Sequence, residues 1–451
     1  MDDPRDQRIA ELETENAELR KRIALLEHQV QQFLQRRKRS SKRGTPRQGT
    51  PDDRRRQEHR KHPGSFRPDP PADASFIEHD VHPKQCTHCG SDNLERTKDV
   101  EDHVVADIPE PKLEWHRYRR HVYRCRCCQQ TCQGRGDLEL PGSHIGPRAR
   151  LLTAYGRAHL GISLGKTQNL LHDFFGLSVS RAGLLGHLRW AGQLFEPIVE
   201  ELFERLRNSP VVQGDETGWR INGQTAWAWC FRDPTLALFL IDRHRNRDVL
   251  LRTLGASFAG TLVSDFYAAY NGFDCPKQRC LVHLLRELAK LREELPWQSV
   301  QSFIQPLLTL FQDAIQLGKD RATLSDAAFD RAHQIIHDRF DDLILGCRSR
   351  HPECLRIWRR LFKHCDELFT FLDDPRVPAD NNGCERDIRS LAAARNDGGV
   401  HRAEWSAAAF ARIKSVIATG YKNGVRFIHY GLEVVRAKLQ GQPLPLPLAS
   451  N

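Results

Sequence analysis

Two aspartates at the ends of short apolar runs are the residues of this 451-residue chain best suited to chemistry. Asp215 ends the segment VVQGD and Asp265 ends the segment TLVSD, so each is predicted at the tip of a buried strand. Because an unpaired buried charge is costly, carboxylates in such places predict a site rather than core filling. Side by side in one sheet, they would suit a hard divalent cation.

A third carboxylate, Glu385, lies in the segment DNNGCERDIR, which predicts the start of a helix. Glu385 and Arg389 are four residues apart and therefore share one helix face. Between the second aspartate and this helix, Cys280 and His283 have Cys-x-x-His spacing. They are either a satisfied core pair or a contact to a substrate strand.

The elements that must position these residues are those of an α/β domain. Strands are predicted at 211–219, 226–231, 236–241 and 261–265, where branched and aromatic residues gather. A long helical stretch at about 297–372 separates the second aspartate from Glu385 and is predicted to be an insertion.

Two Cys-x-x-Cys pairs predict a structural zinc site of the ribbon type, with Cys86, Cys89, Cys125 and Cys128 as ligands. The stretches 104–108 and 115–123 between them predict strands. The second pair is ambiguous, because Cys127 and Cys132 could replace Cys128 and His88 could serve as a ligand. A redox dithiol is the alternative to zinc.

A helix-turn-helix is the hypothesis for residues 148–208, where the pattern becomes helical. One helix is predicted at 164–175, a break at Gly176 and Leu177, and a second helix at 180–190 with Ser178 or Ser180 as its N-cap. Arg181, His187 and Arg189 lie on the second helix, and Arg181 and Arg189 are candidate DNA contacts. A helical hairpin that does not contact DNA is the alternative.

An uninterrupted heptad pattern at residues 9–33 predicts a parallel two-stranded coiled coil and hence a homodimer. The single polar residue in the apolar seam, Asn16, can pair with its own copy. An amphipathic helix that packs on its own domain is the alternative. The seam positions are Ile9, Leu12, Asn16, Leu19, Ile23, Leu26, Val30 and Phe33.

The net charge of +10 comes entirely from residues 36–67, a segment with thirteen Lys or Arg and three acidic residues. The segment lacks apolar periodicity and predicts a disordered basic arm that contacts nucleic acid phosphates. A merely solubilising linker is the alternative. The candidate DNA contacts in the arm are Arg36, Arg37, Lys38, Arg39, Arg54, Arg55 and Arg56.

Composition excludes several other classes of protein. The longest apolar run, near residues 236–241, is far shorter than a membrane span, and the charged amino terminus leads into no signal-peptide core. A cytoplasmic protein without a membrane partner is therefore expected. Its thirteen cysteines are then core residues or metal ligands rather than a disulfide framework.

The segments GDETGW, SDFYAAY and NNGCERDIR resemble the three signature blocks of the insertion sequence 66 family, a branch of the DDE transposases. The zipper, the two Cys-x-x-Cys pairs and the helical segment occur in the family's order, so the resemblance covers most of the chain. It implies a ribonuclease H-like fold, with Asp215, Asp265 and Glu385 as the catalytic triad. Cys280 and His283 resemble the Cys-x-x-His element of many such enzymes.

The implied activity is cutting and joining of insertion-sequence ends by phosphoryl transfer with two Mg²⁺ ions, for which Mn²⁺ can substitute. Asp215 would bridge both ions, and Arg386 and Arg389 would contact phosphate near Glu385 or form salt bridges to Asp380 or Asp387. DNA ends and target DNA would be the partners. The rival hypotheses are a non-enzymatic DNA-binding regulator and a nuclease of the same fold that cuts without joining.

The expected architecture is a multidomain α/β protein. Its predicted parts are a coiled coil at 1–35, a basic arm at 36–75, a zinc ribbon at 76–147, a helix-turn-helix-like segment at 148–208, and a catalytic domain at 209–440 that contains the helical insertion.

Overall fold

The computed structural model describes residues 70–71, 73–398 and 401–449. The predicted zipper and nearly all of the basic arm lie outside the described residues. By its internal contacts the chain forms two compact units, Met1–Val104 and Val105–Asn451. In the part that the structure describes, no helix is long and apolar enough to cross a membrane.

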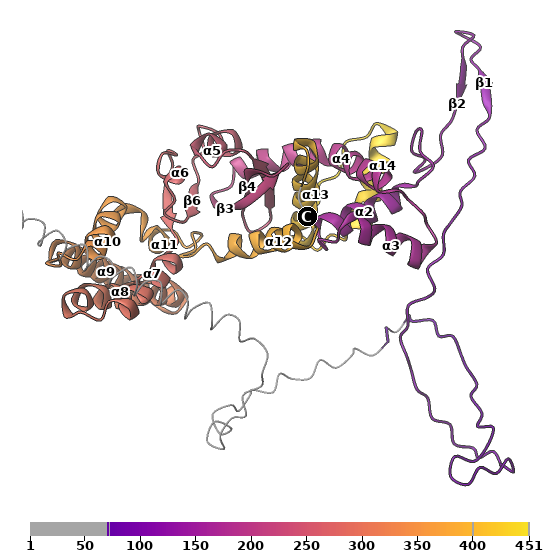
Figure 1. The fold of residues 1–451 in the computed structure, drawn as a ribbon, viewed down its shortest axis with the longest axis horizontal. Helices are drawn as coiled ribbons and strands as arrows, with labels where there is room; N and C mark the ends of the chain where they lie inside the picture. Colours follow the sequence, from indigo (N-terminus) through magenta and orange to yellow (C-terminus); the bar gives the residue numbers. More distant parts are fainter. Residues whose placement is uncertain (1–69, 72, 399–400, 450–451) are drawn as a thin grey trace, which may run out of the picture. The chain divides into compact units, whose positions relative to one another are not determined.

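A five-stranded mixed sheet forms the centre of the second unit (Figure 1). The strands follow the order β5-β4-β3-β6-β7, in which β4 is antiparallel to both neighbours and β6 and β7 run parallel to β3. Their bounds are β3 Val211–Ile221, β4 Gln224–Arg232, β5 Ala237–Asp242, β6 Thr261–Ser264 and β7 Lys277–Arg279.

The four predicted strands are confirmed, but Asp215 does not end its strand. The parallel pairing of β3 with β6 stops at Gln213, whereas the antiparallel pairing with β4 continues to Ile221. Strand β7 was not predicted, because its residues Lys277, Gln278 and Arg279 are polar and yet buried.

Helices before and after the sheet in sequence share one hydrophobic core with it, including Phe195, Trp229 and Ile413. The helix α13 covers the outer edge of β5, where Ser415 Oγ and Thr419 Oγ1 accept the N–H groups of Phe239 and Ala237 at 2.8 and 3.2 Å. These hydroxyls satisfy donors that an open sheet edge would expose. The helices are α2 Pro147–Ala158, α3 Leu164–Phe175, α4 Arg181–Arg207, α5 Arg247–Leu254, α6 Ala268–Asn271, α12 Asn382–Gly398, α13 Glu404–Lys422 and α14 Phe427–Gln440.

The predicted pair of helices joined by a tight turn is confirmed as α3 and α4. Ser163 and Ser180 cap the two amino termini by accepting N–H groups with their hydroxyls. Gly176 ends α3 with a φ of 65°, a left-handed conformation that favours glycine. The second helix is longer than the predicted range 180–190 and continues to Arg207, because its apolar face extends into the main core.

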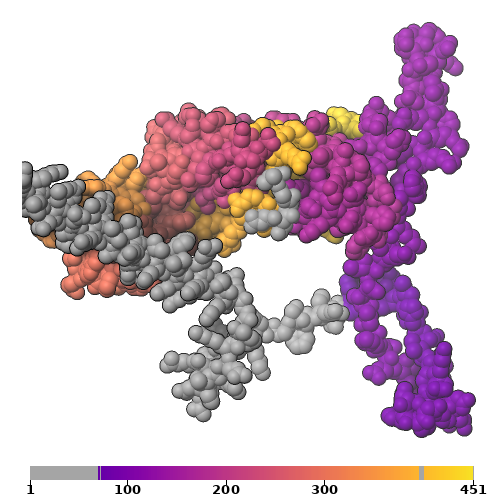
Figure 2. Space-filling model, viewed as in Figure 1, coloured from indigo at the N-terminus to yellow at the C-terminus, as the bar shows by residue number. Residues whose placement is uncertain are grey.

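The stretch predicted as a helical insertion does consist of helices and has a second hydrophobic core of its own. Val211 of β3 and Val263 of β6 belong to this core, so the insertion packs directly against the sheet. Figure 2 shows it as a body that adjoins the part built around the sheet. Its elements are α7 Leu281–Glu294, α8 Gln298–Asp320, η2 Arg321–Thr323, α9 Asp326–Leu345, α10 Pro352–Lys363, η3 Cys365–Glu367 and α11 Thr370–Asp373.

Of the two strands predicted between the Cys-x-x-Cys pairs, the one at 104–108 is wrong and the one at 115–123 is present only at its last two residues. Residues 104–108 and 115–121 form no strand, and the only pairing in this stretch is a short hairpin of β1 Val122–Arg124 with β2 Thr131–Gln133. Apolar alternation produces a strand only where one face is buried. Here Val104, Ile108 and Trp115 are all exposed.

Candidate functional site

The register of the parallel strands places Asp215 and Asp265 side by side. In β3 and β6, Val211 pairs with Thr261 and Gln213 with Val263, an offset of fifty residues. When this register is extended by two residues beyond the last pair, Asp215 lies level with Asp265, which directly follows β6. The two aspartates predicted from sequence therefore lie side by side, where β6 ends and β3 continues.

The third parallel strand adds Cys280 to this row. Ser264 of β6 pairs with Arg279 of β7, so the next residue of each chain segment, Asp265 and Cys280, stand at one level. The N–H of Cys280 donates to the Ser264 carbonyl at 2.8 Å. Cys280 is also the N-cap of α7, which places His283 in the first helical turn.

Asn381 attaches the helix of Glu385 to this part of the sheet. Its side-chain Nδ2 donates to the Gly214 carbonyl at 2.8 Å, next to Asp215 in the chain, and its backbone N–H donates to Cys280 Sγ at 3.2 Å. Its carbonyl accepts the Glu385 N–H at 3.1 Å. Asn381 is fully buried, so it fixes the start of α12 on β3. Asn381 was not among the site residues predicted from the sequence.

Electrostatics show that the three carboxylates are close enough to interact. Burial, together with the negative charges of Glu216, Asp265 and Glu385, raises the pKa of Asp215 to about 7. The hydrogen bond from the Glu216 N–H to Asp215 Oδ1, at 2.9 Å, acts in the opposite direction. The site therefore concentrates negative charge around Asp215.

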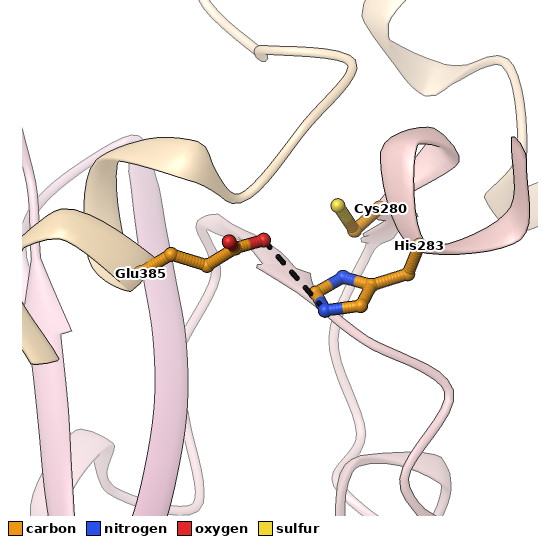
Figure 3. A group of neighbouring side chains, drawn as sticks. All are labelled: Cys280, His283 and Glu385. Atoms are coloured by element: carbon orange, nitrogen blue, oxygen red, sulfur yellow. Dashed lines mark ion pairs between the residues drawn. The ribbon is translucent and has the colours of Figure 1, made fainter. Parts of the chain in front are cut away.

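The carboxylate of Glu385 faces the imidazole of His283 (Figure 3). Its Oε1 lies 3.6 Å from His283 Nε2 and 3.6 Å from Arg286, and its Oε2 lies 3.5 Å from Arg389. Among the described residues, a group of three metal-binding atoms within 4.8 Å of one another is formed by Cys280, His283 and Glu385. The predicted triad thus shares Glu385 with a second donor set.

A buried network holds Glu216, the neighbour of Asp215. Arg245 donates to Glu216 Oε1 at 2.9 Å, and the Tyr270 hydroxyl donates to Oε2. The guanidinium of Arg245 stacks on the rings of Trp227 and Tyr267 at 4.4 and 3.7 Å. Burial raises the pKa of Glu216, whereas Tyr270 and Arg245 lower it. Glu216 thus has its own partners and supports the strand around Asp215.

The remaining residues predicted around the site are placed as follows. Arg386 and Arg389 on α12 are exposed, and Arg389 pairs with Glu385 rather than with Asp380 or Asp387. Asp387 instead lies 3.5 Å from Arg232.

On α4, Arg181 and Arg189 are exposed, and Arg189 lies over the ring of Trp405. His187 is buried against Thr153 Oγ1 at 3.1 Å, so it is not available to DNA.

Both Cys-x-x-Cys pairs form the same tight turn, each within its own unit. Gly90 donates to the Cys86 carbonyl at 2.8 Å, and Gln129 donates to the Cys125 carbonyl at 3.0 Å. Gly90 and Gln129 occupy the same place in the turn, with φ of 74° and 59°. Cys128 thus holds the place in its turn that Cys89 holds in the first, whereas Cys132 lies in β2 opposite Tyr123.

Backbone N–H groups in each turn point toward the first thiol. Those of His88 and Cys89 lower the pKa of Cys86, and those of Cys128 and Cys127 lower the pKa of Cys125. A lowered thiol pKa favours the thiolate, the form that binds zinc. The donor chemistry of each turn therefore fits a metal knuckle.

Comparison with known proteins gives three matches. A family described as "Transposase IS66 family" matches residues 143–409, more than half of the chain. A domain described as "zinc-finger binding domain of transposase IS66" matches residues 83–129. The chain is also similar to an uncharacterised protein, y4qI, of Sinorhizobium fredii, with 25% identity over 404 residues that span 81% of this chain and 73% of that protein. The first match contains all three carboxylates, and the second contains both Cys-x-x-Cys pairs.

Proposed function

The chain belongs to the IS66 family of transposases, and from this premise we propose that it is a DDE-type enzyme that cuts and joins the ends of an insertion sequence. Asp215, Asp265 and Glu385 form its catalytic triad. The observation that carries this proposal is the common level of Asp215 and Asp265 on adjacent parallel strands, with Glu385 brought to the same place by Asn381.

The sheet supports a ribonuclease H-like catalytic domain. Counted in chain order from β3, its strands are arranged 3-2-1-4-5, and only the second strand is antiparallel to the rest. This is the strand arrangement expected of that fold. The first carboxylate stands on the central strand and the second directly follows its parallel neighbour.

The three carboxylates fit a hard divalent cation. Mg²⁺ prefers oxygen ligands, and the negative charge that raises the pKa of Asp215 is what a bound cation would relieve. Two Mg²⁺ ions held by Asp215, Asp265 and Glu385 would activate the attacking oxygen and stabilise the leaving oxygen, and Mn²⁺ would serve in their place.

The reaction consists of two phosphoryl transfers. Water attacks the phosphodiester at the end of the element, which breaks the bond to the 3′ oxygen and releases a 3′ hydroxyl. That hydroxyl then attacks a target phosphodiester and displaces a target 3′ oxygen. Arg286 and Arg389 beside Glu385, together with the exposed Arg386, would bind phosphates on either side of the reacting one.

We propose roles in DNA recognition and assembly for other parts of the chain. Cys86, Cys89, Cys125 and Cys128 would hold one structural zinc, and the zinc-finger domain supports this metal. Arg181 and Arg189 on α4 would contact element ends. The basic arm and a zipper homodimer fall on residues outside the described part of the chain.

The test is a strand-transfer assay with purified full-length protein. Labelled DNA that carries the inverted repeats flanking the gene is incubated with a target plasmid in Mg²⁺ or in EDTA. We expect joined product in Mg²⁺ only, and none from Asp215→Asn. Asp248→Asn, a carboxylate on α5 outside the triad, is the matched control and should join as the wild type does.

The outcomes separate the rival functions. Cleavage without joining would support a nuclease. A gel shift without cleavage in either condition would support a DNA-binding regulator and refute the proposal.

A further inference from the structure

Cys280, His283 and Glu385 form a compact set of metal-binding atoms with mixed chemistry. One atom from each residue lies within 4.8 Å of the others. The three residues come from the end of β7, the first turn of α7 and the first turn of α12. A thiol and an imidazole are poor ligands for Mg²⁺ but good ones for Zn²⁺ and related ions, so this set does not belong to the chemistry of the three carboxylates.

The spacing of the donors suits a tetrahedral ion without rearrangement of the backbone. Ligands at about 2.0–2.3 Å from such an ion stand roughly 3.3–3.8 Å apart. The distance from His283 Nε2 to Glu385 Oε1 is 3.6 Å, too long for a hydrogen bond but within that range. Figure 3 shows the imidazole turned toward the Glu385 carboxylate, with the Cys280 sulfur beside the ring.

Buried polar atoms at this place lack hydrogen-bond partners. Glu385 Oε1, which faces His283 Nε2, is inaccessible to solvent and makes no hydrogen bond; the other ring nitrogen of His283, Nδ1, is also buried and without a hydrogen bond. Native proteins rarely leave such atoms unsatisfied unless an ion or water completes them. Arg286 and Arg389 also lie near Glu385, but their side chains are 55% and 73% exposed and are free to swing into solvent.

Burial raises the pKa of the Cys280 thiol, but backbone N–H groups around the sulfur act in the opposite direction and would stabilise a metal-bound thiolate. The sulfur is completely buried and accepts the Asn381 N–H at 3.2 Å. It also stands at the amino terminus of α7, where backbone N–H groups favour negative charge. Such hydrogen bonds orient a ligand and support the metal that it binds.

We propose that Cys280, His283 and Glu385 bind one thiophilic divalent cation, Zn²⁺, with a fourth position open to water. The inhibitory consequence rests on the proposed function. Because Glu385 belongs to both donor sets, a cation here occupies one of its carboxylate oxygens and competes with the Mg²⁺ ions for this ligand. Zn²⁺ therefore inhibits the Mg²⁺-dependent reaction, and the site couples the enzyme to the supply of thiophilic metal.

Co²⁺ tests the binding site independently of catalysis, because cobalt–thiolate bonds absorb light. Full-length protein with its structural zinc in place is titrated with Co²⁺. The spectrum of Cys280→Ser, titrated in the same way, is subtracted to remove absorption from Co²⁺ that has replaced zinc at the other cysteines. We expect one equivalent of cobalt–thiolate absorption, displaced by Zn²⁺. Cys347→Ser, which removes a cysteine elsewhere in the insertion, is the matched control and should keep the absorption.

Two further variants guard against misfolding and against confusion with the catalytic site. His283→Ala changes a partly exposed residue and removes a metal ligand. It should weaken Co²⁺ binding by more than the roughly 10- to 100-fold expected when only a hydrogen-bond partner of a ligand is removed. Asp215→Asn should keep the cobalt absorption while it abolishes strand transfer. Failure of strand transfer in the wild type would thus refute the proposed function and leave this site standing.

Identical cobalt spectra for the wild type and Cys280→Ser, or unchanged affinity in His283→Ala, would overturn the metal site. Cys280 and His283 would then be a packed pair that positions Glu385. Strand transfer that persists when Zn²⁺ has displaced all of the cobalt would overturn the inhibitory role alone.

Discussion

Replacement of Asn381 by alanine should separate assembly of the site from folding of the chain. Asn381 links three parts: its side chain reaches Gly214 on β3, its N–H reaches Cys280, and its carbonyl receives the Glu385 N–H. Alanine keeps the two backbone contacts and removes only the side-chain link at 2.8 Å. What is lost is the direct attachment of α12 to the strand of Asp215.

The expected cost follows from the burial of this link. Loss of one buried hydrogen bond that leaves its acceptor unsatisfied costs about 1–3 kcal/mol. The lower part of that range is expected, because Asn381 Oδ1 has no hydrogen-bond partner and its removal costs nothing. The effect on catalysis should be larger, since a shift of about 1 Å in a reacting group can cost roughly 100-fold in rate.

The assay compares Asn381→Ala with Asn382→Ala, the adjacent residue of the same type. Unfolding in urea measures stability, a gel shift measures binding of element ends, and strand transfer measures the reaction. Asn381→Ala should bind DNA normally and lose about two orders of magnitude in strand transfer. Asn382→Ala should stay within about 0.5 kcal/mol of the wild type and remain active. Normal strand transfer by Asn381→Ala would refute the role assigned to this link.

Four further predictions follow from other parts of the chain. Cys128→Ser should lower the zinc content measured in the purified protein, whereas Cys132→Ser should not; the reverse would mean that the turn has been assigned wrongly. Burial and the charge of Arg150 lower the pKa of His187 to about 4, below the unfolded value of about 6.5, so its contribution to stability is present above pH 6.5 and is lost as the pH falls toward 4. The free energy of unfolding should fall by about 2 kcal/mol more between pH 7 and pH 5 in the wild type than in His187→Gln; equal changes would contradict this. Asn16→Leu should change the oligomeric state in ultracentrifugation, and an unchanged profile would count against the zipper. Deletion of residues 36–67 should flatten the salt dependence of non-specific DNA binding, and an unchanged slope would place the main DNA contact elsewhere.

The central part of the sheet could be predicted because its strands are apolar on both faces. The runs before Asp215 and Asp265 are buried by helices on either side, as parallel strands usually are. Strand β7 escaped prediction because its three residues are polar and satisfied by distant partners. Arg279, for example, pairs with Glu367 and Asn271. Without β7, the position of Cys280 beside Asp265 could not be foreseen.

Asn381 and the partners of Glu385 were equally out of reach from sequence. Asn381 lies in a polar stretch, DNNG, whose composition predicts only a turn. Its role depends on contacts to residues more than a hundred positions away, Gly214 and Cys280. Between the cysteine pairs the error was the reverse: a strand was predicted where none forms. Apolar and polar residues alternate there, but neither face of the segment is buried. Periodicity thus located the strands, whereas long-range pairing determined how the site is assembled.

Metal rescue tests most directly whether the carboxylates bind metal for DNA chemistry. Asp265→Cys replaces a hard oxygen ligand by a soft sulfur that accepts Mn²⁺ more readily than Mg²⁺. The wild type should catalyse strand transfer in either ion, whereas Asp265→Cys should be inactive in Mg²⁺ and regain activity in Mn²⁺. Strand transfer by Asp265→Cys at the wild-type rate in Mg²⁺, or no activity in either ion from folded protein that binds element ends, would contradict the role of Asp265 as a metal ligand.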